Sequence, residues 1–438
     1  MLQPITTSVY TFSNLREGEF VYVDKTETIR ELIRPKFAQY FCARPRRFGK
    51  SLLISTLQSI FEGRRELFRG LAIDESDYDW KTYPVMRLDM GSCQADTVEL
   101  FWGKVGARME SEARRNGVDY PEGKPVSVAF SELIERFAAK SPERKMVLLL
   151  DEYDKPLLGH LGTPEVTKFK NALKEFYSVV KTQEGYQRFA FMTGVSKFSK
   201  VSIFSDLNNL TDITMDARFA TLLGYTREDL LANFPEMIAA LAGAQGLTPE
   251  GAFAKLEEMY DGFRFHPKSE RVFNPVSVGK CLSLLEFGNY WFETGTPTFL
   301  VEQLKREPLE MDDLHVTTDD LSSAYEPEQV RMLPLMVQTG YLTIKSSSVE
   351  GRTTDCELGY PNGEVEESMS KHLARAYSCL PDDDFSSIYR GLCAGLREGD
   401  PNAVLEGLKC FFENIPYDLQ VKYERYYQSL FYSIFLML

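Results

Sequence analysis

The chain has 438 residues, of which 43% are apolar and 26% charged, so it is an ordinary globular protein of two or three domains. Its 50 basic and 64 acidic residues give a net charge of −14, which argues against a protein built mainly to coat nucleic acid and leaves room only for a local basic groove. The seven cysteines form no C-x-x-C pair and the four histidines lie far apart, which argues against a disulfide framework and a zinc site.

The two ends of the chain carry no sign of membrane insertion. The N-terminus lacks a basic segment followed by an apolar stretch, so we expect no signal peptide. The most apolar run, residues 429–438, is too short to span a bilayer. We therefore expect a cytoplasmic protein with reduced cysteines and no contact with a membrane.

Short apolar runs alternate with helical patterns over the first half of the chain. Strands are predicted at 36–43, 84–90, 146–151 and 188–194, with a further candidate at 209–215. Helical spacing of apolar residues follows the first strand up to Gly63 and recurs at 131–139 and 166–180. This alternation predicts an α/β fold, a parallel sheet with helices on both faces.

A phosphate-binding pattern lies between the first strand and the helix that follows it. The general pattern is G-x-x-x-x-G-K-[ST], and Gly49, Lys50 and Ser51 fill its second half. Glycine lets the backbone approach the phosphates, lysine brings a positive charge to them, and serine serves the metal ion. The strand–loop–helix context is the one that a P-loop NTPase requires.

The first half of the pattern is unusual, because Arg44 replaces the first glycine and Pro45 follows it. Proline fixes its own backbone and restricts Arg44 to extended conformations, so rigidity replaces the freedom of glycine. It also removes one amide donor. Arg46 and Arg47 add positive charge, although a solvated basic turn is the alternative interpretation. We assign nucleotide binding to the loop residues Arg46, Arg47, Phe48, Gly49, Lys50, Ser51 and Leu52.

Two carboxylates follow the third strand. Five apolar residues precede Asp151 and Glu152, which suits a central strand whose carboxyl end reaches the ligand-binding edge of the sheet. Asp151 is predicted to hold Mg²⁺ together with Ser51, and Glu152 to orient or deprotonate the attacking water. The alternative is a strand that meets a polar turn, with Asp154 capping the next helix.

The second half of the chain is predicted to contain three smaller parts. Helix starts at Thr226, Thr248, Asn274 and Thr296 predict a helical lid over about 223–310. A helix, two strands around a polar hairpin and another helix predict a small winged-helix-like module over 311–380, with few basic residues. Helical patterns fill 381–438, and the first domain is placed at 1–222.

The ordered set of these motifs resembles the prokaryotic AAA-ATPase-like proteins that carry a C-terminal PD-(D/E)XK nuclease domain. The similar stretches are 20–33, 43–57, 67–73, 147–157, 191–216, 260–265, 273–278, 339–344 and 358–365. The resemblance implies ATP and Mg²⁺ as ligands of Gly49, Lys50, Ser51, Asp151 and Glu152. In that family the arginine-rich loop without its first glycine is the usual form.

The resemblance also adds candidates outside the two main motifs. The strand at 188–194 is expected between the loop strand and the carboxylate strand, with Thr193 or Ser196 contacting the γ-phosphate or the attacking water; turn capping around Gly194 is the alternative. A trio matched by 24–26 has no assigned chemistry, and a helix N-cap by Asp24 or Thr26 is the plain interpretation. Arg218 and Arg264 are candidates for a trans-acting arginine, although a structural role is expected for each.

In the resembled family the nuclease domain begins where this chain ends. We expect 381–438 to be the helical start of a truncated nuclease domain. Glu424 matches an accessory glutamate of the first nuclease helix, although a plain role on the helix surface is the favoured alternative. The apolar face near Tyr426, Leu430 and Phe435 predicts self-association or a protein partner. The function expected from the whole sequence is an ATP-hydrolysing switch or motor. A nucleotide-binding scaffold that hydrolyses poorly is the alternative, and nuclease activity is disfavoured.

Overall fold

The computed structural model describes residues 3–197, 210–291, 300, 304, 314–323, 331–351, 353–378 and 380–413. Within them the first half of the chain forms a five-stranded sheet in the order β2-β3-β4-β1-β5, and all its neighbours are parallel. The strands are β1 (Ala38–Ala43), β2 (Val85–Asp89), β3 (Met146–Asp151), β4 (Gln187–Gly194) and β5 (Thr211–Asp212). The α/β fold expected from the sequence is confirmed.

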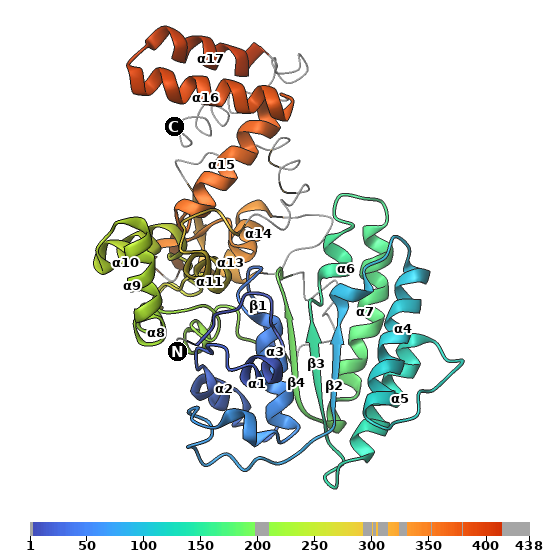
Figure 1. Cartoon of the computed structure of the whole chain (residues 1–438). Coiled ribbons are helices and arrows are strands. Elements are labelled where there is room, and N and C mark those ends of the chain that lie inside the picture. Colours follow the sequence, from blue (N-terminus) through green and yellow to red (C-terminus); the bar gives the residue numbers. More distant parts are fainter. Residues whose placement is uncertain are drawn as a thin grey trace.

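Helices cover both faces of this sheet. In Figure 1, α1, α2 and α3 lie on one side of the strands, and α4, α5 and α7 lie on the other. The helices are α1 (Phe12–Glu17), α2 (Thr26–Ile33), α3 (Lys50–Phe61), α4 (Val98–Arg115), α5 (Val126–Ala139), α6 (Lys155–Leu158) and α7 (Val166–Thr182). Short 3-10 turns are η1 (Arg65–Phe68), η2 (Met90–Cys93), η3 (Glu184–Tyr186) and η4 (Ala217–Phe219).

The two central strands are the most deeply buried part of the molecule. Every residue of β3 and of β4 is buried, as their continuous apolar sequences require when helices cover both faces. β4 lies between β1 and β3, which is the place that the family resemblance predicted for it. The strand expected at 209–215 is much shorter, because β5 pairs with β1 over two residues only.

A helical part follows the sheet, with a core of its own. Its helices are α8 (Arg227–Asn233), α9 (Pro235–Gln245), α10 (Pro249–Tyr260) and α11 (Pro275–Leu284). The predicted starts are confirmed, because the side chains of Thr226, Thr248 and Asn274 accept hydrogen bonds from the first helical amides. Leu230, Ile238 and Leu256 are among the buried residues that form this second core. The start expected at Thr296 lies outside the described residues.

The described residues after 313 form a small sheet and a set of helices. The antiparallel sheet has three strands in the order β6-β8-β7 within the described residues. The elements are β6 (His315–Thr317), α13 (Thr318–Ser322), α14 (Met332–Thr339), β7 (Thr343–Glu350), β8 (Thr353–Gly359), α15 (Gly363–Ser378), α16 (Asp382–Glu398) and α17 (Pro401–Glu413). The expected helix, two strands and helix are therefore present as α14, β7, β8 and α15, while the domain boundaries and the winged-helix comparison stay predictions.

α15 links this small sheet to the outermost helices. In Figure 1 it rises away from the sheet and meets the pair formed by α16 and α17. Arg375 near its end stacks over the ring of Phe385 in α16, with 5.1 Å between guanidinium and ring centroid. No helix in the described residues has both the length and the apolar character of a membrane span. The six cysteines in the described residues are free, and four of them are buried.

Candidate functional site

The predicted loop and the predicted carboxylates meet at one edge of the large sheet. β1, which leads into the loop, ends with Ala43 opposite Gly194 of β4. β3 pairs with β4 on the other side, and Asp151 at its end lies opposite Asp89 of β2. Because all these strands are parallel, their carboxyl ends share one edge, which is where open α/β sheets bind ligands.

The loop between β1 and α3 turns sharply through two left-handed residues. Arg47 has φ 66° and Gly49 has φ 89°. Glycine tolerates this conformation freely, whereas arginine is strained in it and is held there by its surroundings. The second glycine of the motif therefore stands where the backbone requires it, at the residue before α3 begins.

Lys50 is folded back into its own loop. Only 6% of the residue is exposed, and its Nζ donates to the carbonyl oxygens of Arg44 at 3.0 Å and Pro45 at 2.8 Å. Burial lowers the pKa of Lys50, and the charges of Asp151 and Glu152 oppose that shift. The ammonium group thus lies inside the loop. Its N–H groups, which here donate to the two carbonyls, can donate to phosphate oxygens instead.

Asp151 and Ser51 form the oxygen pair expected to hold a metal ion. Asp151 is 2% exposed, and its Oδ1 accepts the Glu152 amide at 3.0 Å. Burial raises the pKa of Asp151, and the neighbouring Ser51 hydroxyl and Lys50 charge oppose the shift. A hydroxyl and a carboxylate beside the same loop are the hard oxygen ligands that Mg²⁺ prefers, so the donor set fits the ion.

Glu152 has an unusual backbone and a confined side chain. Its φ of 49° lies in the left-handed region, which turns the residue out of the strand. Any side chain at Gly91, just after β2, would collide with the Glu152 carboxylate. Burial raises the pKa of Glu152, against the opposing charges of Lys155 and Lys50. This buried carboxylate, next to the predicted metal ligand Asp151, is the candidate for the general base, and that role stays a prediction.

Thr193 and Ser196, the other two predicted catalytic residues, use their hydroxyls within the protein. Thr193 Oγ1 donates to the Cys42 carbonyl at 2.7 Å, and Ser196 Oγ donates to Asp154 Oδ2 at 2.6 Å. The same Asp154 oxygen accepts the amides of Val195 and Ser196. These bonds tie the end of β4 to the turn after β3, and a role of either hydroxyl in catalysis stays a prediction.

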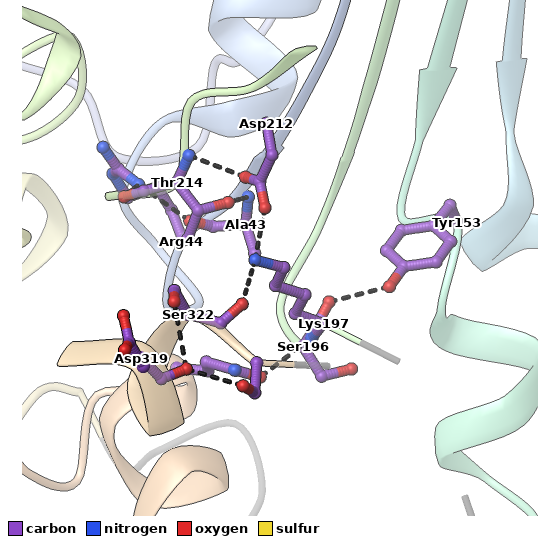
Figure 2. Close-up of polar contacts among 11 residues, drawn as sticks. Ala43, Arg44, Tyr153, Ser196, Lys197, Asp212, Thr214, Asp319 and Ser322 are labelled. Atoms are coloured by element: carbon purple, nitrogen blue, oxygen red, sulfur yellow. Dashed lines mark hydrogen bonds and ion pairs between the residues drawn. The ribbon is translucent and has the colours of Figure 1, made fainter. Parts of the chain in front are cut away.

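Arg44, which replaces the first glycine, is a buried anchor that sequence reasoning missed. It is 1% exposed, and its guanidinium donates to the carbonyls of Ala43 at 2.9 Å, Thr214 at 2.7 Å and Phe219 at 3.1 Å. It also stacks over the ring of Phe265, 4.2 Å from its centroid. Figure 2 shows Arg44 beside Thr214, which in turn accepts the Ala43 amide at 3.0 Å. The side chain fastens the loop to chain segments far away in sequence.

The other large loop residues have partners in the second half of the chain. Phe48 is buried and meets the rings of Phe263 and Phe265 edge-on, with centroids 4.8 and 5.3 Å apart. Arg47 Nη1 donates to the carbonyl of Tyr290 at 2.6 Å. Hydrogen-bonded and aromatic contacts therefore hold the loop from the side of the helical part.

Two further contacts reach the loop from later in the chain. Trp291 Nε1 lies 3.4 Å from the carbonyl of Arg46, to which it donates. A Cβ at Gly340, which ends α14 with φ 88°, would lie 2.8 Å from Pro45 Cβ. The loop is thus enclosed by segments that the sequence places more than two hundred residues away.

A pocket opens beside the loop and is mostly apolar. It lies between the N-terminal segment, the first turns of α3 and the start of the helical part. Its lining residues come from 22–29, 48–56 and 222–225, together with Pro275. Leu52, predicted as a nucleotide ligand, lines it together with Gly49. The pocket therefore places apolar side chains next to the predicted phosphate-binding loop.

The trio at 24–26 is structural in the described residues. Asp24 accepts the amides of Thr26 and Ala72, each at 2.8 Å. The helix N-cap expected at Asp24 or Thr26 is wrong, because α2 begins at Thr26 after Lys25 and no side chain caps it. Lys25 forms an ion pair with Asp229 of α8. The trio therefore joins the first helices to the helical part, beside the pocket.

The two candidate trans-acting arginines have partners within the described part of the chain, and a role of either in trans stays a prediction. Arg218 is an exposed partner of Asp216, with 2.6 Å between Nη2 and Oδ2. Arg264 donates to the carbonyl of Lys345 at 3.2 Å. The apolar tail with Glu424, Tyr426, Leu430 and Phe435 lies outside the described residues, so self-association through it stays a prediction.

Comparison with known proteins places this site in a family. A family model described as "Predicted AAA-ATPase" matches residues 6–204, which contain the loop, both carboxylates and β4. A protein described as "Uncharacterized protein in vnfD 5'region", from Azotobacter chroococcum mcd 1, is 37% identical over 439 residues, which cover 98% of this chain and 81% of that protein. No solved structure matches the chain. With the parallel sheet, the loop and the carboxylates in one place, and with these similarities, the chain belongs to the predicted AAA-ATPase family.

Proposed function

We propose that this protein binds Mg·ATP at the loop between β1 and α3 and hydrolyses it, as a switch or motor for a partner. The observation that carries the proposal is the meeting of Lys50, Asp151 and Glu152 at one edge of the sheet, next to an apolar pocket. Membership of the predicted AAA-ATPase family supports nucleotide use.

Phosphate binding falls to the loop backbone and to Lys50. The α3 N-terminus begins at Lys50, so its unpaired amides and the positive end of its dipole point toward the loop. Lys50 gives up its bonds to the Arg44 and Pro45 carbonyls and turns its donors to phosphate oxygens. Arg46 and Arg47 add positive charge, although Arg47 also serves as a loop anchor.

Ser51 and Asp151 are the residues that would hold Mg²⁺. When bound, the ion would supply positive charge against the negative oxygens of the triphosphate. Burial of Asp151 keeps this acceptor away from bulk solvent, and the Lys50 charge favours its ionised form.

Glu152 is the residue that we assign to the attacking water. Its carboxylate directly follows Asp151, the residue predicted to hold the metal ion, and burial raises its pKa. A carboxylate in this place is suited to accept a proton from the attacking water. The base of the nucleotide is assigned to the pocket lined by 22–29 and 222–225, where apolar side chains give stacking area.

A nucleotide-binding scaffold with little hydrolysis is the second candidate. It is favoured by the internal bonds of Thr193 and Ser196, which leave both predicted contacts to a γ-phosphate or water engaged elsewhere. A link to a nuclease rests on the family resemblance alone, and the net charge of −14 gives nucleic-acid binding no support.

The test of nucleotide binding uses the full chain and isothermal calorimetry with Mg·ATP. Lys50→Ala removes the buried ammonium donors and is expected to weaken binding more than tenfold, since charge-assisted hydrogen bonds contribute about 1.5–3 kcal/mol each. Lys168→Ala, at a lysine whose side chain is 68% exposed on α7, is the matched control and should bind as the wild type does. Equal affinities for the Lys50 variant and the wild type would refute the proposal.

A further inference from the structure

Glu364 connects the last part of the described chain to the phosphate-binding loop. It lies in the first turn of α15, in the segment 358–365 that the sequence analysis singled out without assigning a chemistry. The residue is 1% exposed. Its Oε1 accepts the amide of Trp291 at 2.6 Å and also the amide of Tyr290. A single carboxylate oxygen therefore fixes two consecutive peptide groups of another segment.

Those two residues hold the loop. The Tyr290 carbonyl accepts the Arg47 guanidinium at 2.6 Å, and the Trp291 indole donates to the Arg46 carbonyl. Arg47 is the loop residue held in the left-handed conformation, with φ 66°. The path from α15 to the strained turn of the loop thus consists of two residues and contains no exposed side chain.

A second polar connection from the same part of the chain reaches the end of β4. The Lys197 amide donates to Gln338 Oε1 of α14 at 2.8 Å, and its ammonium group donates to the Ser322 carbonyl in α13. The same ammonium group forms an ion pair with Asp212 of β5. Figure 2 shows Lys197 between Asp212 and Ser322. The residues after 313 therefore contact both the loop side and the β4 side of the nucleotide site.

We propose that Glu364 is a positioning residue for the phosphate-binding loop, and that through it nucleotide occupancy and the stability of α15 are coupled. The inference rests on the proposed nucleotide binding and adds the element that responds to it. Glu364 contacts no nucleotide group, so its effect passes through Tyr290 and Trp291. α15 leads to α16 and α17, so a change in the stability of α15 would also affect this helix pair.

The physical reason for this coupling is the free-energy cost of separating α15 from the loop. If Tyr290 and Trp291 moved with the loop while α15 stayed, a buried carboxylate and two buried amides would lose their partners. The loop and α15 therefore favour moving or staying together. By thermodynamic linkage, a change at α15 that alters loop affinity implies an equal effect of nucleotide on α15.

The experiment compares three variants of the full chain at pH 8, with a non-hydrolysable ATP analogue and Mg²⁺ as the ligand. Glu364→Ala removes the acceptor and is expected to weaken binding about tenfold, the equivalent of one lost buried charge-assisted bond. Glu364→Gln keeps an acceptor oxygen and should recover most of the affinity. Glu367→Ala, at an exposed glutamate on the same helix, should bind as the wild type does.

Hydrogen exchange supplies the readout that a merely structural role would not change. In the wild type, the analogue should slow amide exchange in residues 363–378 several-fold, and this effect should be absent in Glu364→Ala even at saturating analogue. If Glu364→Ala does not fold, the wild-type exchange and the Glu364→Gln affinity decide the matter. Analogue binding that leaves α15 exchange unchanged would overturn this inference and keep the proposed function. No binding of the analogue by the wild type would overturn both.

Discussion

The carboxylate side and the loop side of the proposed nucleotide site are built in different ways. Asp151 and Glu152 are adjacent in sequence, and the register of β2, β3 and β4 places them at the sheet edge. The loop takes its shape from contacts with chain segments at 214–219, 263–265, 290–291 and 340. One side follows from local sequence and sheet pairing, whereas the other depends on the packing of the whole chain.

From this difference we expect the carboxylate side to serve the chemical step and the loop side to serve its regulation. A carboxylate positioned by a buried central strand has little freedom, so it suits steps that need fixed geometry. A loop fixed by several distant segments is sensitive to anything that moves those segments, so it suits a switch. The comparison predicts that substitutions on the carboxylate side change turnover, and that substitutions behind the loop change stability and affinity.

The largest effect is expected behind the loop, at Arg44. Arg44→Ala leaves three buried carbonyls without their donor and removes the stacking partner of Phe265. We expect a loss of about 3 kcal/mol or more in the free energy of unfolding, measured by urea denaturation, because each such bond to a charged group contributes about 1.5–3 kcal/mol. Arg218→Ala, at an arginine whose side chain is 74% exposed, should change it by less than about 0.5 kcal/mol. Equal unfolding free energies of Arg44→Ala and Arg218→Ala would contradict the proposed difference between the two sides of the site.

On the carboxylate side, Glu152→Gln should act on turnover alone. The substitution keeps the shape of the side chain and removes its ability to accept a proton, so ATP turnover should fall on the order of a hundredfold while Mg·ATP affinity stays within about threefold. Phosphate release and calorimetry measure the two quantities, with Glu165→Gln as the surface control. A Glu152→Gln variant that lost Mg·ATP affinity and kept its ATP turnover would mean that Glu152 acts in binding, as the loop does, and not in the hydrolysis step.

Glu364 gives a pH-dependent test of the loop side. Burial raises the pKa of Glu364 to about 7, while the Trp291 and Tyr290 amides and the Arg47 charge oppose the shift. A carboxyl group whose pKa is higher in the folded state stabilises the fold at low pH, and this contribution is lost as pH rises through about 7. Relative to wild type, Glu364→Gln should therefore gain on the order of 2 kcal/mol in unfolding free energy between pH 5 and pH 8.

Urea denaturation at several pH values measures this difference, and the neighbouring groups do not interfere with it. Burial raises the pKa of Tyr260 far above this range and that of Cys281 to about 12. Glu367→Gln should show a constant offset from wild type at every pH. A constant offset for Glu364→Gln as well would mean that the buried carboxyl does not titrate in this range.

The smallest effect is expected at the ion pair between Asp229 and Lys25, which lines the pocket. Both side chains are partly exposed, at 16% and 19%, so Lys25→Met should cost about 1 kcal/mol or less in unfolding free energy. Asp229→Ala should cost more, because this carboxylate also accepts the Thr226 amide in the capping box of α8. A double-mutant cycle separates the two contributions, and a larger loss at Lys25 than at Asp229 would contradict this reasoning.

Sequence patterns predicted those elements whose residues all lie in the same kind of surroundings. The strand expected at 146–151 is found with the same bounds, because a strand buried on both faces reads as a continuous apolar run. The helix starts with polar caps were also predictable, since capping is a local interaction. α9 was missed, because its alanines give weak periodicity and only three of its residues are buried.

The loop side of the site was beyond sequence reasoning for a physical reason. Its positive charge and rigid proline were visible, but the guanidinium of Arg44 serves carbonyls that tertiary packing brings near. Glu364 was part of a noticed motif, and nothing local revealed that its carboxylate would be buried against Tyr290. Local patterns predict which groups carry chemistry, and they do not predict which distant groups hold them in place.

Arg44 also matters for any redesign of this loop in protein engineering. A designer who aligned residues 44–51 with the general phosphate-loop pattern would restore glycine at position 44, which improves the match to other nucleotide-binding proteins. That edit removes a buried cation that three carbonyls and an aromatic ring surround, and it adds backbone freedom next to Pro45. Closer agreement with the consensus would leave a looser loop, so homology-guided redesign has to treat this position as part of the core.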